Sequence, residues 1–299
     1  MSHTPKQWLI AARPWSFVVS AMPVIVTTSL LYFLQYPIHW TRALLALVGI
    51  LFFHAAGNLL SDYYDYLKGI DADDTTGAKT LTSGEFQPIE IRAYGVVMLL
   101  CGSLVGLLLV WLTGSWALLA VGLAGALVTV LYTFMKSHAL GDLNVLLTFG
   151  ILPALGTSIA ATGSLQWSSL WAVLAIVPIT ICVLHTNNTH DVPTDARAGI
   201  LTLPMLIGRQ ASIWLYCIFD ALPIVWVTLC VMLGQMPWAA LLIWLSAGIV
   251  MRNCRTMLSF SHDAHAIDVL DQATAQQQLV SGGLLTVGIL GFTLISHLL

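Results

Sequence analysis

Two polar motifs, both built from asparagine and aspartate, interrupt long apolar stretches of this 299-residue sequence. They read Asn58-x-x-x-Asp62-x-x-Asp65 and Asn187-Asn188-x-x-Asp191-x-x-x-Asp195. Carboxylates are costly near a bilayer, so acids at the ends of apolar segments are expected to serve a function. Carboxylate and amide oxygens are ligands that suit Mg²⁺. The motifs therefore predict a divalent-cation site at the place where they meet.

The composition is that of an integral membrane protein. Hydrophobic residues make up 58% of the chain and charged residues 8%, with a mean hydropathy of +0.86, whereas soluble domains carry about 25% charged residues. The net charge of −3 is too small and too dispersed to indicate nucleic-acid binding. The polar start is not followed by a cleavage site, so we expect the first apolar segment to remain as an anchor. The five cysteines form no C-x-x-C pair and are expected to pack as small hydrophobic side chains.

Nine apolar segments are expected to cross the bilayer as helices, each needing about 20 residues. These predicted spans are residues 17–36, 42–62, 92–113, 116–135, 142–162, 169–190, 211–232, 237–253 and 279–298. The second and the sixth span run directly into the two polar motifs. The expected fold is therefore an all-α, polytopic membrane bundle of nine transmembrane helices.

The distribution of lysine and arginine predicts how these helices are oriented. Nine spans place ten of the 11 basic residues on one side of the membrane and only Arg42 on the other. The basic side is expected to be cytoplasmic, with the amino terminus inside and the carboxyl terminus outside. Both polar motifs emerge on that side. We therefore expect a multi-pass protein of the cell inner (cytoplasmic) membrane with its functional site facing the cytoplasm.

A weak internal repeat relates the two motifs. Each starts with Asn-x-x-x-Asp and is followed by Gly-Ile, at Gly69 and Gly199, and then by Thr-Leu, at Thr80 and Thr202. Repeated halves that face each other are common in membrane bundles. We predict a single domain over residues 1–299, with pseudo-repeated halves at about 10–140 and 141–275 and a last helix at 279–298. Such symmetry would bring the two acidic segments together.

Helical spacing places the polar residues of each motif on one face, because residues three and four apart are neighbours on a helix. Pro193 argues against regular helix between Asp191 and Asp195. Mg²⁺ usually takes one or two protein carboxylates and completes its shell with water and substrate phosphate. Two sparse acidic motifs therefore suit a bridged diphosphate. Basic residues expected to stand near it are Lys79, Lys136, Arg197 and Arg13.

Three other polar residues have simpler interpretations. His262-x-x-His265 has a ligand-like spacing, but it lies in a polar loop, where a solvated role is favoured. Asp220 falls in the middle of the seventh span. We favour a hydrogen bond from Asp220 to a neighbouring helix over a proton path.

The sequence resembles the UbiA-type intramembrane aromatic prenyltransferases, most closely the 1,4-dihydroxy-2-naphthoate polyprenyltransferases of menaquinone biosynthesis and their animal relatives. The resemblance covers nearly the whole chain. The matching stretches are Ala12-Arg13-Pro14, Asn58 through Asp62-Tyr-Tyr-Asp65-Tyr-Leu-Lys-Gly69-Ile-Asp71, Leu131-Tyr-Thr, Lys136, Leu140-Gly-Asp142, and Leu184-His-Thr-Asn-Asn188-Thr-His-Asp191 through Pro204. Two aspartate motifs with these flanking residues are a specific signal.

The resemblance implies nine helices around a central cavity and Mg²⁺-dependent transfer of a polyprenyl chain from polyprenyl diphosphate to an aromatic acid. For dihydroxynaphthoate, the ring carboxylate would leave as CO2. The residues implied to hold the diphosphate through Mg²⁺, the four aspartates being the catalytic ones, are Asn58, Asp62, Asp65, Asn187, Asp191 and Asp195. The further residues expected to bind substrate are Asn188, Lys79, Lys136, Arg13, Asp71, Asp142, Tyr132 and Arg197.

The sequence departs from the naphthoate enzymes at two positions. Ser61 stands where a second asparagine is frequent, and Arg197 follows Asp195 by two positions instead of one. One position is about 100° of helical rotation, which weakens the case for a diphosphate contact by Arg197.

Three alternatives remain open at this stage. The same fold serves other acceptors, such as 4-hydroxybenzoate or homogentisate. A secondary transporter also uses intramembrane acids, but transport sites lie near the bilayer midplane, whereas these acids gather at one face. An inactive lipid-binding relative is disfavoured because all six predicted metal-site residues are present.

Overall fold

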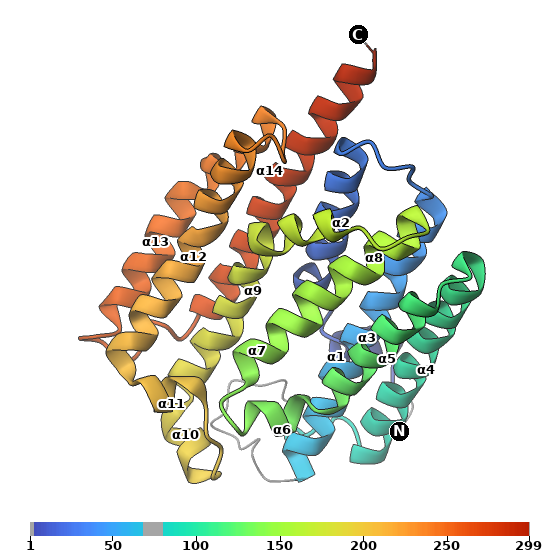
Figure 1. Ribbon diagram of the computed structural model, residues 1–299. Helices are drawn as coiled ribbons and strands as arrows, with labels where there is room; N and C mark the ends of the chain where they lie inside the picture. Colours follow the sequence, from blue (N-terminus) through green and yellow to red (C-terminus); the bar gives the residue numbers. More distant parts are fainter. Residues whose placement is uncertain (1–2, 68–79, 299) are drawn as a thin grey trace.

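The computed structural model describes residues 3–67 and 80–298, which form an all-helical bundle (Figure 1). The elements of the amino-terminal half are α1 (Pro5–Ala11), η1 (Pro14–Phe17), α2 (Val18–Phe33), α3 (Trp40–Leu67), α4 (Pro88–Thr113), α5 (Trp116–Val130) and α6 (Tyr132–Lys136). The later elements are α7 (Gly141–Leu146), η2 (Leu147–Ile151), α8 (Leu152–Thr162), η3 (Trp167–Ser169), α9 (Leu170–His190), α10 (Val192–Arg197), α11 (Leu203–Ile207), α12 (Arg209–Met232), η4 (Trp238–Ser246), α13 (Ala247–Ser259) and α14 (Leu270–Leu298).

Seven helical stretches among the described residues are long and apolar enough to cross a membrane. They coincide with seven of the nine predicted spans. The other two predicted spans are divided: residues 116–135 comprise the 15-residue α5 and the start of α6, and residues 237–253 comprise η4 and the first part of α13. The polytopic, all-helical fold is thus confirmed, whereas the count of nine spans and their orientation stay predictions.

Local sequence signals account for where several helices start and stop. Thr4 caps α1 in a reciprocal capping box with Gln7, and Pro88 occupies the first position of α4. The backbone of Gly114 adopts the left-handed conformation after α4, with a φ of 63°, which glycine adopts without steric cost. Ser115 then caps α5 through its side chain. The chain therefore reverses tightly between α4 and α5.

The bundle is organised around α9. This helix packs against α12, α14 and α2. In the most apolar stretch of the span that contains α9, 61% is buried, whereas in that of α4 only 17% is buried. The largest buried cluster joins residues of α2, α9, α12, η4, α13 and α14. In contrast, α4 packs mainly along α3 and leaves Leu100, Leu104 and Trp111 exposed. α4 and α5 lie at one edge of the bundle in Figure 1, where such side chains suit contact with lipid.

A buried polar network joins the last three long helices. Gln277 of α14 donates to Asp220 Oδ1 of α12 at 2.8 Å and accepts from Asn253 Nδ2 of α13 at 2.6 Å. The prediction that Asp220 bonds to a neighbouring helix is therefore confirmed. All five cysteines are free, as expected from their spacing. The network fixes the axial position of α14 because each buried group would otherwise lose its partner.

The last helix begins earlier than the sequence predicts. α14 starts at Leu270 instead of residue 279, so its first turns carry polar residues that we expected in a loop. The exposed side chains of His262 and His265 lie in the short connection before α14, which agrees with the solvated role predicted for them. α14 is consequently long enough to reach the end of the bundle that carries both motifs.

Close packing of α14 on η4 is testable at Gly288. A Cβ atom at this position would overlap the backbone carbonyl of Ala239. We expect Gly288→Ala to displace α14 and to lower the melting temperature of the detergent-solubilised protein, since overpacking costs about 1–3 kcal/mol. Gly291→Ala is the matched control, because a Cβ atom there meets nothing within 4 Å. Equal melting temperatures for the two variants would contradict this packing.

Candidate active site

Both polar motifs lie at the same end of the bundle. In Figure 1 the carboxyl end of α3, which carries the first motif, is close to α6 and on the same side as α10 and α11. The second motif spans the junction between α9 and α10. The convergence predicted from the internal repeat is therefore observed in the arrangement of the helices.

The first motif is held by the segment before α2. Arg13 donates from its guanidinium to Asp62 Oδ1, and Asn58 Nδ2 donates to the Ala12 carbonyl at 3.2 Å and to Ser16 Oγ at 3.1 Å. The backbone of Arg13 has a φ of 56°, a left-handed conformation uncommon for residues other than glycine. Backbone strain of this kind gathers at functional sites, where the surrounding structure enforces it.

The second motif lies on a bent but continuous helical path. The Asp191 N–H donates to the Asn187 carbonyl and the Asp195 N–H donates to the Asp191 carbonyl, both at 2.8 Å. Pro193 occupies an early position of α10, where a missing N–H is harmless. The prediction that Pro193 interrupts the helix between Asp191 and Asp195 is wrong, because Val192–Arg197 is helical and only Asp191 separates α9 from α10. Asn187, Asp191 and Asp195 stay on successive turns.

The loop that follows Lys136, the last residue of α6, is joined by backbone hydrogen bonds to the loop after α10. Ala139 N donates to the Leu201 carbonyl at 2.7 Å, and Leu201 N donates to the Ser137 carbonyl at 3.2 Å. Gly141 then brings the start of α7 against α9, because a Cβ atom there would lie 3.2 Å from Leu184. Lys136 and the loop after α10 are therefore positioned together.

The motifs border a cavity of about 1620 Å³. At its polar end it is lined by Arg13, Asn58, Asp62, Asp65, Tyr132, Lys136, Asn187, Asn188, Asp191 and Asp195. From Ala46 to Asp65, residues of α3 line its length, a distance of about 28 Å at 1.5 Å per residue. Most of the remaining wall is apolar and comes from α4, α5, α7, η2 and α8. One cavity thus combines an acidic end with a long hydrocarbon-like section.

The charges at the polar end act on one another. Burial is the main cause that raises the pKa of Asp195 to about 6, and the nearby carboxylates of Asp191 and Asp65 add to the rise, while Lys136 opposes it. Burial alone would lower the pKa of Lys136, but Tyr132 and the carboxylates of both motifs raise it above its ordinary value. The site holds more negative than positive charge and therefore favours a cation.

The donor set fits a hard divalent cation. Asp195 is 4% exposed, and its Oδ2 atom has no hydrogen-bond partner among the described residues. Within residues 3–67 and 80–298, no group of three His, Cys, Asp or Glu side chains is arranged to hold a metal ion. The six predicted ligands line one cavity, and their role as ligands of Mg²⁺ stays a prediction.

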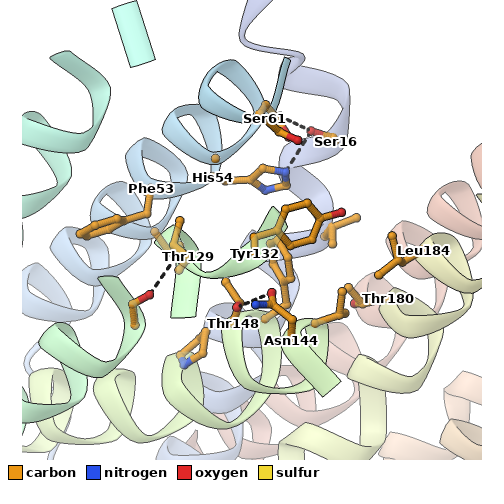
Figure 2. Close-up of a pocket in the computed structure, with 18 of the residues that line it drawn as sticks. Ser16, Phe53, His54, Ser61, Thr129, Tyr132, Asn144, Thr148, Thr180 and Leu184 are labelled. Atoms are coloured by element: carbon orange, nitrogen blue, oxygen red, sulfur yellow. Dashed lines mark hydrogen bonds between the residues drawn. The ribbon is translucent and has the colours of Figure 1, made fainter. Parts of the chain in front are cut away.

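A second group of polar residues lines the cavity and was not predicted (Figure 2). His54 lies between Ser16 Oγ, at 3.2 Å, and Ser20 Oγ, at 2.9 Å. Thr148 donates to Asn144 Oδ1 at 3.1 Å beside the π-helical turn η2. Such turns are rare and frequent at functional sites. The spacing marks His54, which lies one helical turn before Asn58 on the same face. It does not mark Asn144 or Thr148, because each is a single polar residue in an apolar span.

Two predicted substrate residues lie elsewhere. Asp142 is buried, and its Oδ2 atom lies 2.9 Å from His185 Nδ1, between α7 and α9. Arg197 is exposed on α10. Neither belongs to the described residues that line the cavity. Asp71 and Lys79 lie outside the described residues.

The start of α14 adds residues that the sequence analysis missed. Asp271, Gln272, Ala275, Gln276 and Leu279 line the cavity. Their spacing of three and four residues is the helical pattern of a single face. This signal was present in the sequence but was obscured by the expectation that α14 begins at residue 279.

Comparison with solved structures gives the same overall fold. A structure of digeranylgeranylglyceryl phosphate synthase matches with a TM-score of 0.62 at 17% identity, covering 96% of this chain and 98% of the other. A structure of a UbiA homologue from Archaeoglobus fulgidus bound to GPP and Mg²⁺ matches with a TM-score of 0.56 at 13% identity, covering 94% of this chain and all (100%) of the other.

Comparison with curated sequences gives closer relatives. The UbiA prenyltransferase domain-containing protein 1 homolog of Drosophila melanogaster is 34% identical over 221 residues, which are 71% of this chain and 60% of the fly protein. UbiA prenyltransferase domain-containing protein 1 of Danio rerio is 35% identical over 219 residues, 70% of this chain and 63% of the fish protein. The match thus spans less than two thirds of the length of these relatives. The model of the UbiA prenyltransferase family matches residues 20–265, and this chain belongs to that family.

Proposed function

We propose that this protein transfers a polyprenyl chain from polyprenyl diphosphate to an aromatic acceptor in a Mg²⁺-dependent reaction at the cytoplasmic face of the membrane. The observation that carries the proposal is one cavity whose polar end is lined by both acidic motifs and whose remaining wall is largely apolar. A diphosphate fits the first part and an isoprenoid chain the second. The A. fulgidus homologue with GPP and Mg²⁺ supports this assignment.

The two acidic motifs are the proposed holders of the cation. Asn58, Asp62 and Asp65 of α3 would hold it from one side, and Asn187, Asp191 and Asp195 of α9, α10 and the junction between them from the other. When bound, Mg²⁺ supplies positive charge that offsets the charge of the diphosphate. Arg13 and Lys136 add two fixed cationic groups beside the motifs.

The proposed reaction is an electrophilic alkylation. The bond between the allylic carbon and the diphosphate oxygen breaks, and Lys136 and Arg13 stabilise the charge that the leaving diphosphate gains. The allylic cation is protected from water by the apolar wall, and the ring of Tyr132 stabilises it through its π face. A ring carbon of the acceptor then forms the new bond to the allylic carbon.

The most specific acceptor that we propose is 1,4-dihydroxy-2-naphthoate. In that case the new bond forms at the ring carbon bearing the carboxylate, CO2 leaves, and its bonding electrons restore the aromatic ring, giving the reduced (hydroquinone) form of a demethylmenaquinone-type product. The polar side chains of His54, Asn144 and Thr148 line the cavity in which such a ring would bind. The alternatives are another aromatic acceptor, including 4-hydroxybenzoate and homogentisate, or a secondary transporter.

Removal of one carboxylate from either motif should abolish catalysis. We expect Asp62→Ala and Asp191→Ala to form no detectable product from geranyl diphosphate and dihydroxynaphthoate, because each would lose an oxygen ligand for the cation. Membrane insertion should be unaffected. Products are identified by mass spectrometry, with each variant's melting temperature as a folding control. Normal turnover by both variants would refute the site.

Chelation should stop the reaction reversibly. Addition of EDTA removes the divalent cation that the excess of carboxylates requires, so product formation should fall to background. An excess of Mg²⁺ should restore it, because oxygen ligands suit this ion. The measurement is the initial rate before and after each addition. Undiminished turnover in EDTA would exclude a role for a dissociable cation.

The apolar section should determine which chain lengths are accepted. Gly106 of α4 lines the cavity, and a Cβ atom there would meet nothing within 4 Å. Gly106 lies 14 positions beyond Arg92, about 21 Å along α4 from the polar end. We expect Gly106→Leu to keep turnover of dimethylallyl diphosphate and to reduce that of geranylgeranyl diphosphate at least tenfold. Gly291→Leu, outside the cavity, is the control. An unchanged chain-length profile would place the isoprenoid chain elsewhere.

A further inference from the structure

The ring of His190 links the second acidic motif to the loop before the last helix. His190 Nδ1 lies 2.7 Å from Asp191 Oδ1, and His190 Nε2 lies 3.2 Å from Asp268 Oδ1. The other oxygen of Asp268 lies 3.2 Å from His265 Nδ1. A chain of polar contacts therefore runs from a proposed cation ligand to residues 260–269, which precede α14. His190 and Asp268 are not among the described residues that line the cavity.

Asp191 requires support of this kind. It stands at the junction of α9 and α10, and its side chain is 32% exposed. A carboxylate in such a place is free to rotate, and ordering it around a cation costs conformational entropy. The contact from His190 holds one oxygen, Oδ1, of a side chain that lines the cavity. This is the role that hydrogen-bond partners of metal ligands commonly serve.

The ring of His190 is suited to bridge two carboxylates. Each of its nitrogens faces one carboxylate oxygen, and a carboxylate accepts hydrogen bonds but does not donate them when ionised. The two contacts together link Asp191 to Asp268 through one rigid ring.

The far end of the bridge lies beside the start of α14. Asp268 lies two residues before Leu270, where α14 begins. The first two turns of α14 carry Asp271, Gln272 and Gln276, which line the cavity. Anchoring Asp268 to His190 therefore holds this rim of the cavity against the second motif.

We propose that His190 and Asp268 are a positioning pair that orients Asp191 for the cation and fixes the start of α14 at the rim of the cavity. This inference rests on the function proposed above. It concerns residues that touch neither substrate nor the cation. The pair acts through Asp191, so its loss should weaken cation-dependent substrate binding without removing a cation ligand.

The experiment measures binding, not turnover. Isothermal titration calorimetry of geranyl diphosphate, repeated over a range of Mg²⁺ concentrations, gives the Mg²⁺ concentration for half-maximal binding. His190→Ala should raise it by about 10–100-fold, the usual cost of losing a partner of a metal ligand. His190→Arg should restore it to within a few-fold of the original protein, because a guanidinium donates to two carboxylates.

A mutant cycle tests whether the two residues act as one unit. Asp268→Ala should raise the Mg²⁺ concentration for half-maximal binding, as His190→Ala does. The double variant should need no more Mg²⁺ than His190→Ala alone, because Asp268 acts through His190. Asp268 is exposed, so its variant remains informative even if His190→Ala folds poorly. Asp263→Ala is the control in the same loop: Asp263 accepts a hydrogen bond from the His265 N–H, and its loss should leave the Mg²⁺ requirement unchanged.

The outcomes separate the two proposals. If the original protein binds geranyl diphosphate with Mg²⁺ and His190→Ala has the same Mg²⁺ requirement, the positioning pair is wrong and the proposed function stands. A defect in His190→Arg as large as that in His190→Ala would also overturn the pair. Failure of the original protein to bind geranyl diphosphate at any Mg²⁺ concentration would instead overturn the proposed function.

Discussion

Mutual repulsion among carboxylates at one end of an apolar bundle is the constraint on which the rest of the structure depends. Asp65, Asp191 and Asp195 lie close enough to perturb the same lysine. Carboxylates this close to one another repel unless positive charge offsets them. Arg13 and Lys136 supply part of that positive charge, and a bound cation would supply the rest. The bundle must therefore hold like charges together in the absence of substrate.

Contacts between segments far apart in the sequence provide that hold. The polar segment before α2 supports α3 through Arg13 and Asn58, and the loop after α6 is joined to the loop after α10 by backbone hydrogen bonds. On the opposite flank, Gln277 fixes α14 to α12 and α13. The acidic residues thus lie on α3, at the junction of α9 and α10, and on α10. Other elements contact these helices from several sides. This arrangement keeps their geometry independent of any one flexible loop.

The sequence was most informative where charged residues stand at the ends of long apolar segments. An acid at the end of an apolar span has few structural explanations. The six motif residues were therefore identified from the sequence, and the structure places all of them in the wall of one cavity. Helix continuity was harder to predict, because hydropathy does not reveal the breaks after α5 and within residues 238–259. The sequence also did not reveal that Asp142 pairs with His185, because this pairing depends on the contact between α7 and α9. Isolated polar residues such as Asn144 and Thr148 gained meaning only from the shared cavity.

The contact between His190 and Asp268 also has a consequence for biogenesis. A ribosome delivers the helices to the membrane in order, so α14 arrives after the helices that carry both acidic motifs. Until the first turns of α14 are in place, Asp191 has no bridge to the loop that contains Asp268, and the rim of the cavity that α14 provides has not yet formed. A nascent chain that has already inserted both acidic helices therefore still lacks part of the cavity wall.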